Sequence, residues 1–413
     1  MDAVEAAAAP LVEAFLTRLD REFRQFGAAG GMPPRLRDAV RATPRHRFVH
    51  RFRDGRAGPL LDFDADPLGL LPLVYRGEPL THVDAAGAAL PSTNSQAAYV
   101  LWLVALLDVR DGSRVLEIGS GSGWLLAVMA ALAGAGGHAT GIEILPDLAA
   151  QSRADLAAAI GDRAAVIAGD ATRDPIPGGP FDRVMITAAT WDPPARLFDL
   201  VAEGGFLLVP LRLPGDEGCE VTLLRRSGAG FAAQASFPGF FVPLVGAGQA
   251  AGVRRLSLSD LGFLGTTGPD PSWSAPFRLG GDGRRPGPAS WPFRHYLALT
   301  EPGYAVFAAG EGDDRAATPF GIVDEASSSL ALCRDGRLFA YGTLDAARRL
   351  AAAYRRWCDL GMPGPGSWSL EVCRAEAAPA AGPDLVVEQR GGSALIRRLP
   401  EQAGAWRALL PDA

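Results

Sequence analysis

The stretch that decides the fold is S-R-V-L-E-I-G-S-G-S-G, residues 113–123. Its apolar run, 115–118, has the length and composition of a buried parallel strand. Three glycines follow at alternate positions, and apolar residues then recur over 124–132 as they do in a helix. A strand that turns through glycines into a helix predicts a ligand site beside bare backbone at a helix N-terminus. Such turns also serve as tight bends, so the flanking pattern has to decide.

Strands and helices alternate on the carboxyl side of this turn. Strands are expected at 141–143, 165–168, 181–187 and 206–210, and helices at 146–160 and 194–201. The alternation predicts an α/β fold with a doubly wound sheet, whose ligand lies beyond the carboxyl ends of the strands. Acids stand at the ends of three predicted strands: Glu117, Glu143 and Asp170. Glu143, at the tip of the second strand, is placed to accept hydrogen bonds from ribose hydroxyls.

The N-terminal flank reads as two helices, 2–26 and 35–42, followed by mostly loop over 51–90. The segment P-S-T-N-S-Q, 91–96, precedes an apolar helix over 97–107, so Ser95 could be its N-cap. His46 and His50 are four residues apart, but Pro44 breaks the local helix and no third ligand has matching spacing. No metal site is expected.

Composition indicates an ordinary soluble globular protein, with 48% hydrophobic and 21% charged residues. A net charge of −6 argues against nucleic acid or an acidic membrane as the main partner. The four cysteines are widely spaced, which fits reduced thiols better than a disulfide framework. The chain starts without the basic residues of a signal peptide, and its longest aliphatic run is too short for a membrane span. A cytoplasmic protein is expected.

The order and spacing of these segments resemble protein-L-isoaspartate O-methyltransferases over residues 36–244. The matching segments include R-H-R-F-V (45–49), T-N-S-Q (93–96), V-L-E-I-G-S-G-S-G-W (115–124), G-I-E-I-L-P-D-L (141–148), G-D (169–170) and F-V-P-L (241–244). The resemblance implies a class I methyltransferase with a Rossmann-like sheet, dependent on S-adenosylmethionine (SAM).

The resemblance also implies roles for individual residues. SAM contacts are expected from Glu117, Gly119, Ser120, Gly121, Gly123, Glu143, Asp170 and Ala171. Substrate contacts are expected from Thr93, Asn94, Trp191 and Val242. Ser95 takes the place of the active-site serine. A carboxylate is already ionised at neutral pH and needs no general base, so Ser95 is expected to orient the acceptor by a hydrogen bond.

Two departures from the family pattern bear on the substrate. Asn94 and Ala97 replace residues that are usually Ile and Pro, and Thr190, Trp191 and Asp192 are inserted after the fourth strand. The long C-terminal part is also absent from housekeeping members. It is expected to hold strands at 295–300, 304–309, 320–324, 330–334, 337–341 and 368–373, a helix over 344–360 and a hairpin over 385–399. Its strand edges could capture an extended peptide, or the unit could be a structural cap.

Four segments are therefore expected: N-terminal helices and loops at 1–90, the methyltransferase at 91–245, a Gly/Pro-rich linker at 246–290 and an accessory α+β domain at 291–413. This combination resembles variants associated with ribosomally synthesised peptide natural products. Such variants methylate Asp in a constrained precursor peptide, and the ester collapses to aspartimide, which hydrolyses to isoaspartate. The alternatives are repair of isoaspartyl residues in damaged proteins, and an inactive relative that binds a peptide. The intact acids and glycines weigh against the last.

Overall fold

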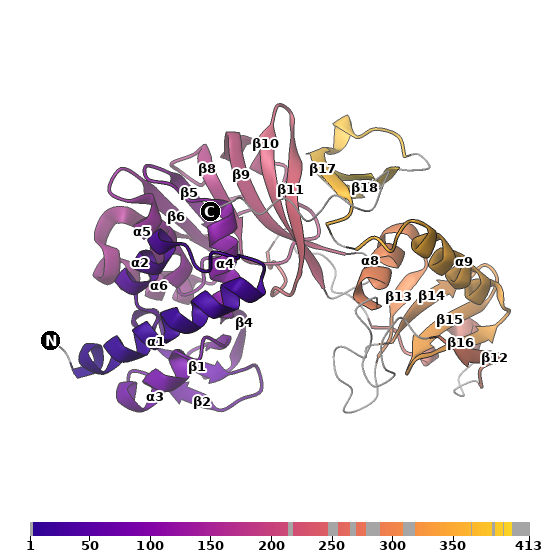
Figure 1. Ribbon diagram of the computed structural model, residues 1–413, viewed down its shortest axis with the longest axis horizontal. Helices are drawn as coiled ribbons and strands as arrows, with labels where there is room; N and C mark the ends of the chain where they lie inside the picture. Colours follow the sequence, from indigo (N-terminus) through magenta and orange to yellow (C-terminus); the bar gives the residue numbers. More distant parts are fainter. Residues whose placement is uncertain are drawn as a thin grey trace.

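The computed structural model describes residues 3–213, 218–246, 255–264, 270–277, 290–308, 319–364, 366–381, 385–390 and 392–398. Most of the expected linker, 246–290, and the end of the chain, 399–413, lie outside these residues. Figure 1 shows a large sheet with N-terminal helices beside it, and a second sheet formed by later parts of the chain.

The large sheet confirms the predicted doubly wound fold. Its strand order is β18-β19-β17-β11-β10-β9-β8-β5-β6-β7. The parallel part consists of β5 (Arg114–Ile118), β6 (His138–Glu143), β7 (Ala164–Ala168), β8 (Phe181–Ile186) and β9 (Val201–Arg212). β10 (Cys219–Ser227) and β11 (Gly230–Gly239) continue it as antiparallel strands. The glycine turn after β5 thus lies at the carboxyl edge of the parallel strands.

One expected helix before β9 is shorter than predicted. Helix was expected over 194–201, but α7 covers only Leu197–Leu200. β9 already begins at Val201, and the turn expected at 203–205 lies within it, where the register with β8 shifts. Residues 202–205 pair with neither β8 nor β10, and Gly204 has a positive φ, so the glycines form an irregularity within the strand.

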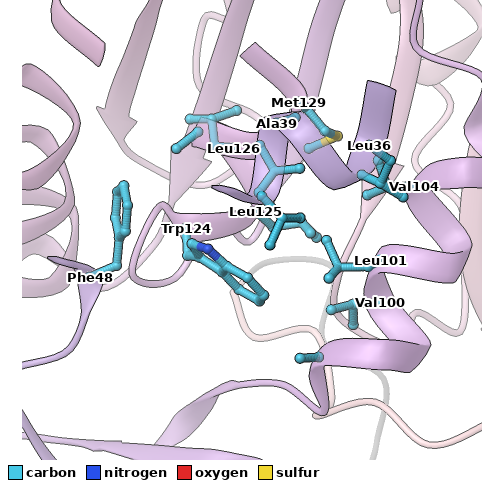
Figure 2. Packing of buried hydrophobic residues seen from close by; sticks show 14 of the residues in the cluster. Leu36, Ala39, Phe48, Val100, Leu101, Val104, Trp124, Leu125, Leu126 and Met129 are labelled. Carbon is cyan, nitrogen blue, oxygen red and sulfur yellow. The ribbon is translucent and has the colours of Figure 1, made fainter. Parts of the chain in front are cut away.

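Helices of the N-terminal region and of the methyltransferase segment share one core. Figure 2 shows Trp124 and Leu125 of α5 (Trp124–Ala133) packed with Leu101 of α4 (Ala97–Leu107) and Leu36 of α2 (Pro34–Ala42). The Trp124 indole nitrogen donates to the carbonyl of Thr43 at 3.0 Å. The expected helices at 2–26 and 146–160 are confirmed as α1 (Ala3–Gln25) and α6 (Pro146–Ile160). Among the described residues, no helix has both the length and the apolar character that crossing a bilayer requires.

The expectation of mostly loop over 51–90 is wrong. This region forms a sheet of order β2-β1-β3-β4, together with helix α3 (Pro67–Val74). The strands are β1 (Arg51–Asp54), β2 (Leu60–Asp62), β3 (Leu80–Val83) and β4 (Ala89–Asn94). Each is too short to show a clear alternation, and Gly and Pro lie between them. β4 ends at Asn94, so this sheet places the segment that contains Ser95.

The C-terminal part divides between two sheets. A separate sheet has the order β12-β16-β15-β14-β13, formed by β12 (Trp273–Pro276), β13 (Tyr304–Val306), β14 (Phe320–Asp324), β15 (Ser329–Arg334) and β16 (Arg337–Gly342). Helices α8 (Ser290–Thr300) and α9 (Asp345–Asp359) contact it. The strand expected at 295–300 is wrong. Its short apolar run also fits a helix, with Phe293 and Leu297 buried at a spacing of four.

The last three strands return to the methyltransferase sheet. β17 (Ser369–Arg374) pairs with β11 through Phe231 and Val372, and β19 (Ser393–Arg398) and β18 (Leu385–Arg390) follow it. Figure 1 shows these strands beside β11 and apart from the sheet that contains β13 to β16. The end of the chain therefore contributes directly to the sheet that carries the glycine turn.

We predict a pH-dependent stabilisation from His50, which joins the N-terminal region to α6. Its ring nitrogens lie 3.0 Å from Asp64 and 3.1 Å from Asp155. The hydrogen bond to Asp155 is the main cause that raises the pKa of His50 to about 9, and partial burial acts in the opposite direction. Because the folded pKa lies above the unfolded value, the contribution is complete below pH 6.5 and disappears as the pH rises through about 9.

The measurement is urea unfolding of the wild type and His50→Gln at pH 6 and pH 10. The variant should be less stable by roughly 1–2 kcal/mol at pH 6, a value reduced for solvent screening, and the difference should shrink at pH 10. Taking the difference between the two proteins removes the titration of the other groups. An equal difference at both pH values would contradict the prediction.

Candidate functional site

A cavity of about 610 Å³ opens at the carboxyl edge of the parallel strands. We call its two walls the glycine-turn side and the Ser95 side. The glycine-turn side includes Glu117, Gly119, Ser120, Gly121, Glu143, Asp170 and Ala171. The Ser95 side includes Thr93, Asn94, Ser95, Arg212, Phe240 and Val242. All of the site residues expected from the sequence except Gly123 and Trp191 line the cavity, which has the size of a small-molecule site.

Gly123 lies behind the glycine-turn side and does not line the cavity. Its φ is +80°, and a Cβ there would approach the Ser152 hydroxyl to 2.3 Å and Leu156 to 3.1 Å. The third glycine therefore lets α6 pack close to the start of α5. Gly119 and Gly121 also have positive φ, and both line the cavity. Gly119 and Gly121 therefore belong to the cavity wall, whereas Gly123 is required for the packing of the two helices.

Two acids hold the shape of the glycine-turn side. The Glu143 carboxylate accepts hydrogen bonds from the backbone nitrogens of Gly121 at 2.8 Å and Leu145 at 3.0 Å. Burial raises the pKa of Glu143, although these backbone donors act in the opposite direction. Asp170 accepts from the Thr172 nitrogen at 2.8 Å and from its hydroxyl at 2.6 Å. Glu143 thus binds both its own loop and the glycine turn, Asp170 binds its own loop, and both residues line the cavity.

Two polar atoms on this wall lack a protein partner. Glu117 and Ser120 are buried, and neither Oε2 of Glu117 nor the Ser120 hydroxyl has a hydrogen-bond partner within the described part of the chain. Burial, with the nearby Glu143 charge, raises the pKa of Glu117 well above its usual range. Buried polar atoms without partners are costly unless a ligand or water satisfies them. The wall therefore fits a polar ligand rich in donors and positive charge, as SAM is.

The structure shows that Ser95 is not the N-cap of α4. The N-cap of α4 is Gln96, whose side chain accepts a hydrogen bond from the Tyr99 nitrogen at 2.7 Å. Ser95 lies one residue earlier, in the cavity wall. A serine–histidine contact is present in this region, but it joins His82 to Ser92, which also lines the cavity, at 2.8 Å. Burial lowers the pKa of His82 to about 4, so its ring is neutral at physiological pH.

Arg45 is a supporting residue to which the sequence assigned no role. Its buried guanidinium donates to the carbonyls of Val74, Glu78, Asn94 and Ser95, at 2.9–3.2 Å. It also lies over the Trp124 ring, 5.4 Å from the centroid. Burial lowers the pKa of Arg45 to about 9. The R-H-R-F-V segment was a signal for this position, but only the fold shows that it reaches Asn94 and Ser95.

Trp191 and Asp192 contact the C-terminal strands instead of lining the cavity. The Arg390 guanidinium lies 4.1 Å from the centroid of the Trp191 ring and donates to the Trp191 carbonyl at 2.9 Å. The Asp192 carboxylate accepts from the Gly392 nitrogen at 3.0 Å and the Ser393 hydroxyl at 2.8 Å. The sequence analysis placed this inserted segment at the substrate. In the structure it lies between β8 and β9 and contacts the last strands of the chain.

The structure gives no support to a metal site. Within the described ranges, no group of three or more His, Cys, Asp or Glu side chains is arranged to hold a metal ion. His46 is buried and contacts the Tyr75 hydroxyl at 2.7 Å, while His50 lies between two aspartates. Both histidines that raised the question therefore have structural partners.

Comparisons with known proteins agree on one family. A family model described as Protein-L-isoaspartate(D-aspartate) O-methyltransferase matches residues 74–249. The protein-L-isoaspartate O-methyltransferase of Ignicoccus hospitalis is 32% identical over 41% of this chain and 81% of its own length. That of Methanoregula boonei is 32% identical over 54% of this chain and 89% of its own length.

A solved structure titled protein-L-isoaspartate O-methyltransferase shares the fold far beyond this match. It covers 86% of this chain and 96% of its own, with a TM-score of 0.50 and 17% identity. At this identity the likeness concerns the fold alone. A C-terminal addition is therefore found outside this chain as well, in a protein that carries the family name. This corrects the expectation that the addition sets the chain apart.

Proposed function

Because the chain belongs to the protein-L-isoaspartate O-methyltransferase family, whose members depend on SAM, we propose that it methylates the free carboxylate of L-isoaspartyl residues in proteins. The observation that carries the proposal is the extent of the match. The family model spans both walls of the cavity, from before Thr93 to beyond Val242. The chain is thus a SAM-dependent methyltransferase, and its acceptor is the part that we infer.

We assign the glycine-turn side to SAM, which supplies a methyl group on a positively charged sulfur. Glu143 would hold the ribose hydroxyls, with Asp170 and Ala171 further along the same wall. Glu117 and Ser120 offer polar atoms that lack protein partners, and Gly119 and Gly121 leave room for close approach of a ligand. The carboxylates of Glu143 and Asp170 on this wall favour a ligand with positive charge and hydroxyl donors.

We assign the Ser95 side to the acceptor. An ionised carboxylate is itself the nucleophile, so the protein has to hold one oxygen in line with the methyl group and exclude water. The Ser95 hydroxyl would donate a hydrogen bond to this carboxylate, while Thr93, Asn94 and Val242 form the wall beside it. Arg45 would support the reaction indirectly, because it fixes the backbone on which Asn94 and Ser95 stand.

A second candidate is methylation of an ordinary Asp in a modified, constrained ribosomal peptide. The insertion of Trp191 and Asp192 favours it, because this segment joins the C-terminal strands to the edge of the cavity. A ring-closed peptide also loses less conformational entropy on binding. The C-terminal addition itself does not favour tailoring over repair, since a protein with the family name shares that fold. Repair of isoaspartyl residues is therefore the first proposal.

The acceptor can be tested by incubating the enzyme and SAM with three synthetic peptides. These are a linear isoaspartyl peptide, its Asp counterpart and a ring-closed Asp peptide. We expect the mass of the isoaspartyl peptide to rise by one methyl group and then fall by methanol as the succinimide closes. Methylation of only the ring-closed Asp peptide would refute the first proposal and establish the second. The linear Asp peptide is the matched control, because it differs from the isoaspartyl peptide only in which carboxyl group of the residue is free.

Ser95→Ala tests the orienting hydroxyl. Because the N-cap of α4 is Gln96, the variant should keep its stability and its SAM affinity. Its kcat should fall about 10- to 100-fold, as expected for a lost hydrogen bond to a charged group. Gln96→Ala is the control, and should lower stability by about 1 kcal/mol with kcat per folded molecule preserved. An unchanged kcat in Ser95→Ala would remove Ser95 from the acceptor site.

Glu143→Ala tests the assignment of the glycine-turn side. Removing the carboxylate should weaken SAM binding by roughly 1–3 kcal/mol, because ligand hydroxyls and the Gly121 nitrogen lose a charged acceptor. Isothermal calorimetry with SAM measures this directly. Glu203→Ala, which removes a carboxylate that accepts from Gly228 away from the cavity, should bind SAM like the wild type. Equal affinity in both variants would exclude Glu143 from the SAM site.

A further inference from the structure

We propose that Arg212 binds the acceptor carboxylate and that the last three strands of the chain hold it in position. The inference rests on the proposed function, because it supplies the partner for the carboxylate which that function requires. It makes Arg212 a specificity-determining residue for the same reaction, and it gives the C-terminal strands a role at the site.

The register of β9 places Arg212 on the same face of the sheet as α4. Arg212 is the last residue of β9, and Leu208, four residues earlier on the same face, packs in the core that includes α4. Leu207 and Leu211 belong to the core on the opposite face. Ser95 lies next to the N-terminus of α4, so Arg212 and Ser95 approach one cavity from the same side of the sheet.

Arg212 is a buried cation with no carboxylate partner among the described residues. The residue is only 7% exposed and lines the cavity, and no acid in the described part of the chain forms an ion pair with it. The two buried arginines nearby differ: Arg390 pairs with Glu388, and Arg397 pairs with Glu220. A buried guanidinium without an anion is costly, so an anionic ligand in the cavity would be favoured there.

The cavity thereby has opposite charges on its two walls. The carboxylates of Glu143 and Asp170 lie on the glycine-turn side, whereas Arg212 lies on the Ser95 side. An anionic acceptor would be drawn to the second wall and disfavoured at the first. The fork of a guanidinium also matches the two oxygens of a carboxylate, which an uncharged amide cannot reproduce.

The reaction itself would weaken this contact. One carboxylate oxygen forms a bond to the methyl carbon as the bond from carbon to the positively charged sulfur breaks. The products are a neutral ester and a neutral thioether, so no atom is left over and no base is needed. Because the ester carries no negative charge, Arg212 holds the product less tightly than the substrate. The same residue thus favours binding of the acceptor and release of the ester.

The C-terminal strands hold the backbone of Arg212. Its nitrogen donates to the Thr190 carbonyl at 2.8 Å, and its carbonyl accepts from the Arg390 guanidinium at 3.0 Å. Arg390 also donates to the Trp191 carbonyl, and Asp192 binds the next strand through Gly392 and Ser393. The segment 190–192 and the end of β9 are therefore fixed together by residues almost two hundred positions later in the chain.

The experiment compares binding of two peptides that differ only in charge. The probes are a linear isoaspartyl peptide and the same peptide with its free carboxylate replaced by a carboxamide, each titrated in the presence of S-adenosylhomocysteine. The wild type should prefer the carboxylate by roughly 10- to 100-fold. Arg212→Gln should bind both peptides equally, and Arg212→Lys should retain part of the preference. Arg225→Gln, at an exposed position on the neighbouring strand, should behave like the wild type.

A second pair of variants tests the C-terminal contact. Asp192→Ala removes the acceptor for Gly392 and Ser393 without altering the cavity lining, and should raise KM for the peptide several-fold with an unchanged SAM affinity. Arg374→Ala removes an exposed ion pair with Asp199 in the same sheet extension and should leave KM unchanged. Equal KM values in these two variants would refute the positioning role.

The outcomes separate this inference from the proposed function. Retention of the full carboxylate preference in Arg212→Gln overturns the role of Arg212, while methylation of the isoaspartyl peptide by the wild type leaves the function standing. A wild type that neither binds nor methylates the isoaspartyl peptide overturns the proposed acceptor, and the inference with it. SAM affinity reports folding of every variant. If Arg212→Gln does not fold, Arg212→Met provides the same comparison, because it also removes the positive charge.

Discussion

The buried guanidinium of Arg45 is the interaction on which the arrangement of the site depends. It binds carbonyls from the end of α3, the loop before β3 and the β4–α4 junction, and it lies over the first residue of α5. The Arg45 side chain thus joins the Ser95 side of the cavity to α5, the helix that follows the glycine turn. A charge buried without a carboxylate is costly, and only several simultaneous carbonyl contacts offset that cost. The two walls therefore keep a fixed separation only while the N-terminal sheet is folded.

The cavity built on this frame separates charge across its width. The acids on the glycine-turn side are partly satisfied by their own backbone, as Glu143 is by Gly121, and partly open, as Glu117 is. The opposite wall offers the Ser95 hydroxyl and the Arg212 cation. The positively charged methyl donor would lie against the acidic wall, and a negatively charged acceptor against the wall with Arg212. Methyl transfer neutralises both charges. Catalysis by positioning then requires a rigid cavity more than it requires an acid or a base.

Local sequence predicted the parts of the fold that local chemistry specifies. The strand 115–118, the glycine turn and the acids at strand ends follow from short-range patterns, and the structure has them where they were expected. The sheet over 51–94 was missed because its strands pair with segments up to thirty residues away and are too short to alternate visibly. Arg45 and Arg212 were missed for a related reason. An arginine in a sequence looks exposed, and only tertiary contacts show which ones are buried.

The C-terminal strands explain why the inserted residues were assigned to the wrong place. Trp191 and Asp192 follow β8, close to the cavity. If the chain had only the strands up to β11, these two residues would be expected near the substrate. Pairing of β17 with β11 brings Arg390 and Ser393 against them instead. The aromatic ring stacks on a cation and the carboxylate caps two donors, so both side chains are already satisfied by protein. Among the described residues at that end of β9, the guanidinium of Arg212 lines the cavity without an acid partner. The inserted residues therefore act on the cavity through the C-terminal strands that hold the Arg212 backbone, and not as part of its wall.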